Sequence, residues 1–139
     1  MIKGLIKTSL DIIKMDAGNV MHALKNNEKS YKTFGEAYFS MIKPGAVKGW
    51  KKHNLMICNF VVPVGKVKVV IYDKPENRFE EILLSTENYF RLTIPPKLWV
   101  AFQGIDTKPS LLLNIASIRH DPAEAENIDL KMIEYNWGN

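Results

Sequence analysis

The segment NFVVPVGKVKVVIYDKPEN, residues 59–77, has the pattern of two β-strands joined by a tight turn. Apolar residues fill most of 59–62, and residues 66–72 begin with the polar–apolar alternation of a strand that buries one face. Pro63-Val64-Gly65 supplies the turn between these strands, and residues 73–77 form the next turn. The segment therefore predicts two successive β-strands with a turn between them.

The same spacing continues on both sides of this segment. Further short strands, separated by turns, are predicted at 37–42, 46–50, 81–84, 89–94, 98–103 and 111–116. Regularly spaced short strands without β–α–β alternation predict an all-β sandwich or barrel. The first 35 residues predict only a short strand or turn, and the tail after Asp121 is more polar and irregular, with 122–126 as the start of a short helix.

Length and composition fit one globular domain spanning residues 1–139. Hydrophobic residues make up 46% and charged residues 24% of the chain, which is ordinary for a protein with a buried core. There is no apolar run of about 18 residues and no signal-peptide pattern, so we expect no membrane span and no secretion. The single cysteine, Cys58, is predicted to be a buried thiol and agrees with a reducing, cytoplasmic compartment.

The positive charge is mild, at +4, and is spread along the chain apart from one cluster around residues 43–52. No arginine-rich arm, zinc-ligand spacing or RNA-binding aromatic motif accompanies it, so nucleic acid is not predicted as a partner. A local site for a phosphorylated small molecule fits this charge equally well. The three histidines lie too far apart in the sequence to predict a metal site.

The centre of the basic cluster is VKGWKKH, residues 47–53. On a regular strand, Lys48 and Lys52 share one face, while Lys51 and His53 lie two residues apart on the other. We expect Lys51 and His53 to face inward and Lys52 to face away. The alternative is a solvated surface patch, since exposed positions are usual for lysine.

Several separated segments together carry a family resemblance. In order, they are FGEAYFSMIKPGAVKGWKKH (34–53), NFVVPVGKVKVVIYD (59–73), IPPKLWVAF (94–102) and LLNIASIRHDPAEAENI (112–128). The chain resembles the dTDP-4-dehydrorhamnose 3,5-epimerase family over nearly its whole length, and sugar-nucleotide 3,4-ketoisomerases share part of the pattern. The resemblance implies a cupin-type jelly-roll β-barrel, a homodimer, and a nucleotide-linked 4-keto sugar bound inside the barrel without a cofactor.

The family's chemistry removes a proton next to a ketone and returns one on the other face, which requires a base, a group to hold the enolate oxygen, and an acid. The family's arginine-glycine-x-histidine stretch reads Lys48-Gly49-Trp50-Lys51 here. Lys48 thus replaces the arginine as a phosphate contact, though without a bidentate fork. Lys51 stands at the position of the base, and His53 matches a second histidine found in many relatives.

The positions that match the family's proton-donating tyrosines also carry different residues here. Asn114 stands where the classical epimerases carry a tyrosine thought to be the acid, and the second tyrosine of that segment falls at His120. Val100 replaces a family histidine, and the apolar residues 55–59 replace a polar stretch. The lysine expected on the following strand is absent unless Lys66 or Lys68 takes its place. The resemblance therefore implies the fold, whereas several of the residues that transfer protons in the family are replaced in this chain.

The candidate residues divide by role. Lys51 and His53 are candidates for base and oxyanion partner, Tyr38 and His120 for the acid, Lys48 and Arg119 for phosphate, Trp50 and Trp99 for stacking, and Asn114 for ligand contact. Each has a structural alternative: a solvated lysine, a loop histidine, a surface ion pair or a tryptophan packed in the core.

The leading hypothesis is a nucleotide-sugar epimerase or ketoisomerase in deoxysugar and surface polysaccharide biosynthesis. A non-catalytic sugar-nucleotide-binding cupin is the rival, which Val100 and the apolar residues 55–59 favour, and a purely structural dimeric module is a third reading. Fold alone does not decide among them. A polar cavity that holds Lys51 and His53 would favour the enzyme, and a barrel filled by apolar side chains would favour the structural reading.

Overall fold

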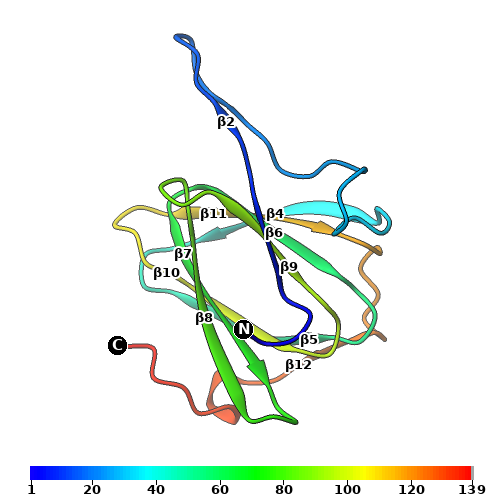
Figure 1. Cartoon of the computed structure of the whole chain (residues 1–139). Helices are drawn as coiled ribbons and strands as arrows, with labels where there is room; N and C mark the ends of the chain where they lie inside the picture. Colours follow the sequence, from blue (N-terminus) through cyan, green and yellow to red (C-terminus); the bar gives the residue numbers. More distant parts are fainter. Residues whose placement is uncertain (139) are drawn as a thin grey trace.

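The computed structural model describes residues 1–138, and two five-stranded antiparallel sheets form its body (Figure 1). The first sheet has the order β1 (Ile6–Ser9), β9 (Phe90–Ile94), β6 (Cys58–Val64), β11 (Ser110–Ala116), β4 (Glu36–Ile42). The second has the order β12 (Ala125–Asn127), β5 (Val47–His53), β10 (Trp99–Gly104), β7 (Lys66–Asp73), β8 (Arg78–Ser85). This arrangement confirms the predicted all-β jelly-roll barrel.

The main core lies between the two sheets and follows from strand alternation. On β7, Val67, Val69 and Ile71 point between the sheets and are fully buried. Phe60 of β6 and Leu92 of β9 meet them from the first sheet. The long β7–β8 hairpin pairs Lys66 with Ser85 at one end and Asp73 with Arg78 at the other, so the turn predicted at 73–77 is confirmed.

A second apolar cluster covers the outer face of the second sheet. Trp50, Val70 and Trp99 are buried there beneath the C-terminal segment, and Tyr135 and Trp137 of that segment pack against Trp50. This segment includes a short 3₁₀ turn, η1 (Leu130–Met132). Both faces of the second sheet are therefore covered, one by the first sheet and one by the chain's own tail.

The short helix predicted to start at 122–126 does not form. Residues 125–127 instead form β12, which pairs with the edge of β5 in the register Ala125 to His53 and Asn127 to Lys51. The backbone N–H and C=O groups of an open strand edge need partners, and strand pairing satisfies more of them than one helical turn would.

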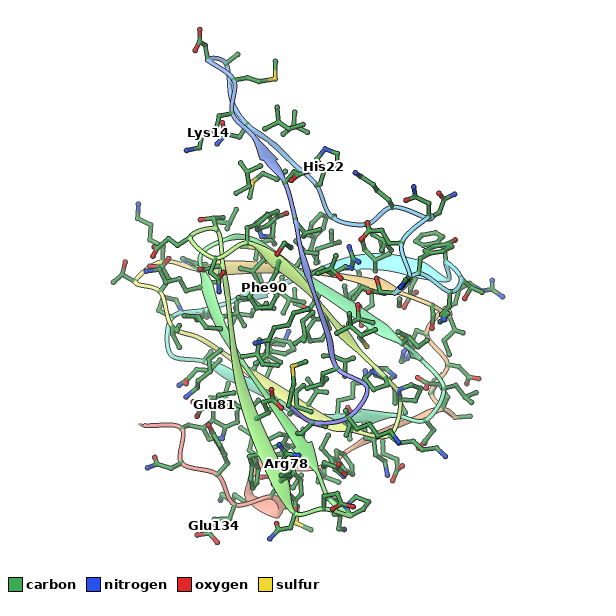
Figure 2. All side chains as sticks on the ribbon, viewed as in Figure 1. Lys14, His22, Arg78, Glu81, Phe90 and Glu134 are labelled. Atoms are coloured by element: carbon green, nitrogen blue, oxygen red, sulfur yellow. The ribbon has the colours of Figure 1, made fainter. Side chains whose placement is uncertain are left out.

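The N-terminal region carries a two-stranded arm made of β2 (Ile12–Ile13) and β3 (Val20–Met21), which projects from the barrel (Figure 1). Figure 2 shows Lys14 and His22 on this arm, away from the space between the sheets. The chain after the arm is fixed to β9 by the fully buried Arg91, which donates to Ala23 O, Glu28 Oε2 and Ser30 Oγ at 2.6, 2.8 and 2.6 Å. Within residues 1–138, no helix is long and apolar enough to cross a membrane.

Candidate active site

A cavity of about 310 Å³ lies between the two sheets, with walls from both. Its polar lining includes Tyr38, Lys48, Lys51, His53, Asn114 and Asn127, and its apolar lining includes Cys58, Phe60, Val100, Phe102 and Leu112. The barrel is thus not filled by apolar side chains, which is the outcome that favours the enzyme among the three readings. No cluster of three or more His, Cys, Asp or Glu side chains suited to a metal ion occurs among the described residues.

A β-bulge in β5 brings two lysines to the cavity. Lys51 pairs with Val100 and Lys48 pairs with Phe102, so two residues of β5 oppose the single residue Ala101 of β10. The extra residue reverses the alternation of inner and outer faces. Lys48 therefore lines the cavity with Lys51, and the expectation that Lys48 shares a face with Lys52 was wrong.

Lys52 lies on the outer face, as expected. Its Nζ is 3.0 Å from Glu126 Oε2 and lies above the Trp99 ring, 5.1 Å from the ring centroid. Trp50 borders the cavity, but its side chain is 1% exposed and packs in the outer cluster. For Trp50 and Trp99, burial in this cluster favours the core-packing alternative over stacking on a ligand.

His53 is held by a carboxylate from the C-terminal region. His53 Nδ1 lies 2.5 Å from Glu124 Oε1, and both side chains are largely buried. Glu124 Oε2 also accepts the backbone N–H groups of Asn54, Leu55 and Met56 at 3.1, 3.0 and 3.2 Å. These contacts connect the ring of His53 with the loop that follows β5.

The charge of Glu124 fixes the tautomer of His53. Burial alone raises the pKa of Glu124, but the hydrogen bonds from His53 and from the N–H groups of Leu55 and Met56 outweigh it and leave the pKa below its ordinary value. An ionised Glu124 can only accept, so Nδ1 of His53 carries the hydrogen between them. The other ring nitrogen, Nε2, is then the one that can take up a proton from a ligand.

Tyr38 and Asn114 line the cavity from the first sheet. They are directly opposite one another on β4 and β11, and Asn114 Nδ2 donates to Tyr38 Oη at 2.9 Å. Desolvation raises the pKa of Tyr38, and the hydrogen bond from Asn114 only partly opposes it. The phenol therefore stays protonated at neutral pH and can act as a proton donor. His53 belongs to the second sheet, so a potential base and a potential acid approach the cavity from different walls.

Cys58 belongs to the apolar wall of the cavity, together with Phe60 and Leu112. It is buried, as predicted, and burial raises the pKa of its thiol to about 12. A hydrogen bond with Asn114 only partly opposes the effect of burial. The thiol is therefore neutral at physiological pH and does not act as a nucleophile.

The other sequence-predicted residues lie elsewhere. Arg119 and His120 are exposed in the loop after β11 and do not line the cavity. Lys66 pairs with the exposed Glu87, and Lys68 lies over the rings of Tyr135 and Trp137, so neither replaces the lysine expected on this strand.

Sequence reasoning missed Glu124, Asn127 and Ile128. Asn127 and Ile128 line the cavity, and Glu124 holds His53. Glu124 stands 71 positions from its partner, and nothing in the nearby sequence distinguishes it from the exposed Glu126 and Glu134 of the same tail.

The jelly-roll barrel with a polar cavity between its sheets defines the protein as a cupin. Comparison with known proteins identifies the family within the cupins. A dTDP-sugar isomerase from Desulfovibrio desulfuricans G20 is 36% identical, with a TM-score of 0.92 over 97% of this chain and 91% of that one. The chain belongs to this family of sugar-nucleotide isomerases and epimerases, as its sequence predicted.

Two further proteins are similar to the chain, one in sequence and one in fold. A probable low-salt glycan biosynthesis epimerase of Haloferax volcanii is 29% identical over 126 residues, which are 86% of this chain and 79% of that protein. The dTDP-4-dehydrorhamnose 3,5-epimerase of Sulfolobus tokodaii is 17% identical and shares the fold, with a TM-score of 0.83 over 96% of this chain and 81% of that one. No protein-family model matches the chain.

Proposed function

We propose that the protein epimerises or isomerises a nucleotide-linked 4-keto-6-deoxy sugar by moving a proton on a carbon next to the ketone. The observation that carries this proposal is the His53–Glu124 pair on one wall of a cavity whose other wall presents Tyr38. The similar proteins support the substrate class, because one is a dTDP-sugar isomerase and another a probable glycan biosynthesis epimerase. The product would then serve surface polysaccharide synthesis.

His53 is the base in this mechanism. Nε2 takes the proton from the carbon beside the ketone, and the electron pair of the broken C–H bond moves to the ketone oxygen to give an enolate. Glu124 then faces an imidazolium and stabilises its charge. Lys51, two residues away on β5, supplies the positive charge that holds the enolate oxygen. The Glu124 contact is the reason to assign the base to His53 and the oxyanion role to Lys51.

Tyr38 is the acid. It returns a proton to the enolate from the first sheet, which is the face away from His53. Water then reprotonates the tyrosinate and takes the proton from His53, so the cycle closes without a cofactor. Proton transfer by one positioned side chain typically contributes about 10²–10⁴-fold to a rate.

The size and lining of the cavity suit the sugar rather than the whole nucleotide sugar. At about 310 Å³ it lies at the lower end of the range of small-molecule sites. The apolar wall of Cys58, Phe60 and Leu112 fits a deoxy carbon, and Lys48 provides a cation for the diphosphate.

We also propose a homodimer in the cytoplasm. Phe39 and Met41 of β4 are 63% and 65% exposed on the outer face of the first sheet. They lie beside Leu113 and Leu111 of β11, so the apolar surface is continuous across two strands. A second copy of this chain is the occupant that such a self-complementary sheet face suits. The free thiol of Cys58 fits a reducing compartment.

Proton exchange with solvent tests the enzyme function. The protein is incubated with dTDP-4-keto-6-deoxyglucose in deuterated water, and the sugar protons are followed by NMR. Deuterium at C3 or C5 with a new sugar product is expected, and its position separates a mono-epimerase, a double epimerase and a ketoisomerase. His53→Asn should abolish exchange, whereas Tyr72→Phe on the outer face should not. Binding without any exchange would overturn the proposal in favour of a non-catalytic binding protein.

A further inference from the structure

Asn114 has no role as a ligand contact in the mechanism above, although it borders the cavity. It is 1% exposed, and both ends of its amide are used within the protein. Asn114 Oδ1 accepts the backbone N–H of Asn59 at 3.1 Å, and Asn114 Nδ2 donates to Tyr38 Oη at 2.9 Å. This buried amide therefore contacts the hydroxyl of Tyr38 directly.

The surrounding hydrogen bonds fix which way the amide of Asn114 points. A backbone N–H can only donate, so the oxygen of Asn114 faces Asn59 and its NH₂ group faces Tyr38. Asn59 is itself held in place, because its side chain accepts from Thr93 Oγ1 at 2.7 Å and donates to Ile115 O at 3.3 Å. The orientation of Asn114 is therefore set by a buried network.

This orientation determines where the hydroxyl hydrogen of Tyr38 points. A phenolic hydroxyl has one hydrogen to donate and accepts with its oxygen. Because Asn114 donates to that oxygen, the single hydrogen of Tyr38 is directed away from Asn114. Tyr38 lines the cavity, so this hydrogen is available to an acceptor atom on a ligand bound there.

We propose that Asn114 is a positioning residue that turns the O–H of Tyr38 toward the sugar, so that Tyr38 delivers its proton to the enolate carbon. This role rests on the proposed function. In the step, the O–H bond of Tyr38 breaks and a C–H bond forms, and the N–H of Asn114 stabilises the tyrosinate until water returns a proton. Consistently, the hydrogen bond from Asn114 lowers the pKa of Tyr38 against the larger effect of burial, which raises it.

Asn114→Asp tests the direction of this hydrogen bond with little change of shape. One carboxylate oxygen still accepts the N–H of Asn59, and the other replaces the NH₂ group and accepts the Tyr38 proton, drawing it away from the sugar. We expect product formation to fall at least about 10-fold. Deuterium exchange at the substrate carbon needs His53 and Lys51 but not Tyr38. It should therefore stay within about twofold of the wild-type rate, because His53 can return deuterium on its own face.

Two further variants keep the proposal testable if a buried aspartate disturbs folding. Tyr38→Phe should likewise keep deuterium exchange and lose product formation. Adding Asn114→Asp to Tyr38→Phe should cause no further loss of product formation. Asn114→Leu removes the donor without adding charge. It should raise the pKa of Tyr38 in a spectrophotometric titration, with Tyr38→Phe identifying the signal.

The chain offers a matched control on its outer face. Tyr72 Oη and Asn77 Oδ1 form a tyrosine–asparagine pair at 3.2 Å outside the cavity. Asn77→Asp introduces the same charge beside a tyrosine and should leave exchange and product formation unchanged.

Three results would overturn the role of Asn114 while leaving the proposed function intact. The first is an equal loss of exchange and of product formation in a folded Asn114→Asp protein. The second is a further loss of product formation when Asn114→Asp is added to Tyr38→Phe. The third is an unchanged pKa of Tyr38 in Asn114→Leu. Absence of both exchange and product in the wild type would instead overturn the proposed function, and the role of Asn114 with it.

Discussion

His53 Nδ1 and Glu124 Oε1 lie 2.5 Å apart although 71 positions separate the residues in the chain. The pairing of β12 with β5 creates this contact, because Ala125 lies directly opposite His53. The second oxygen of the same carboxylate accepts three consecutive backbone N–H groups after β5. One side chain thus orients the ring of the proposed base and closes the loop that follows it, so activity and stability depend on the same group.

Replacing Glu124 by glutamine tests this double role. Glutamine keeps the shape, but its NH₂ group must face either Nδ1 of His53 or the backbone N–H groups. In the first orientation the hydrogen of His53 moves to Nε2, which can then no longer take a proton, and in the second donors oppose donors. We expect product formation to fall about 10²-fold or more. The free energy of unfolding, measured in urea, should fall by about 1–3 kcal/mol.

Glu126→Gln is the matched control for this change. Glu126 lies two residues further on, is exposed, and pairs with Lys52 at 3.0 Å on the outer face. Its loss should leave stability nearly unchanged, because solvent screens an exposed ion pair, and should leave activity unchanged. Equal effects of the two substitutions would contradict the role assigned to Glu124.

Acid should destabilise the protein through the same carboxylate. The pKa of Glu124 is lower in the folded protein than its ordinary value of 4.5, so its contribution to stability is fully present above that pH. This contribution is lost as the pH falls through the folded value. Glu28 behaves alike, because the hydrogen bond from Arg91 lowers its pKa.

The measurement is the free energy of unfolding in urea as a function of pH. In the wild type it should decrease as the pH drops below about 4.5, and in Glu124→Gln the decrease should be shallower. Identical slopes in the two proteins would show that Glu124 does not have a lowered pKa in the folded state.

The local alternation of apolar and polar residues was sufficient to predict most strands, because each strand buries one face and is bounded by turn residues. The alternation at 66–72, for example, matches the buried Val67, Val69 and Ile71 of β7. β12 was missed because its formation depends on the open edge of β5, which the residues at 125–127 do not reveal. Pairing with a distant edge is information that only the folded chain contains.

The candidate site was predictable in part for the same reason. Lys51, His53, Tyr38 and Asn114 were identified from short motifs, and the structure brings them to one cavity. The bulge opposite Ala101 determines on which face of the second sheet the side chain of Lys48 lies. The partner of His53, Glu124, comes from the far end of the chain. Both are consequences of contacts between strands, not of sequence near the residue.

Lys51→Met should remove the charge that stabilises the enolate. We expect product formation to fall about 10²–10³-fold, the usual effect of losing one group that holds a developing oxyanion, with little change in unfolding. Lys52→Met is the neighbouring control, since Lys52 faces Glu126 and Trp99 on the outer side. Steady-state kinetics compares the two, and unchanged turnover in Lys51→Met would remove Lys51 from the mechanism.

Gly49→Ala should disrupt the bulge that presents both lysines. Gly49 has φ +149°, and an added Cβ would lie 2.4 Å from Ala101 Cβ. We expect a loss of about 2–4 kcal/mol from the backbone conformation and the clash together, with reduced activity. Gly18→Ala is the control, because Gly18 also has positive φ, at +138°, but has no atoms within 4 Å of the added Cβ. Unfolding in urea should separate the two, and equal losses would mean that contact with Ala101 is unimportant.

Phe39→Glu should separate the proposed dimer into monomers. Phe39 and Met41 are exposed on the outer face of β4, whereas Tyr38 and Ser40 of the same strand line the cavity. A charge at position 39 would be buried without a partner between two copies, which costs several kcal/mol, yet it is harmless on a free surface. Sedimentation should therefore show a dimer for the wild type and a monomer for Phe39→Glu. Met132→Glu, at a residue 70% exposed on η1, should stay dimeric. A wild-type monomer, or a dimer that Phe39→Glu leaves intact, would mean that this sheet face is not the interface.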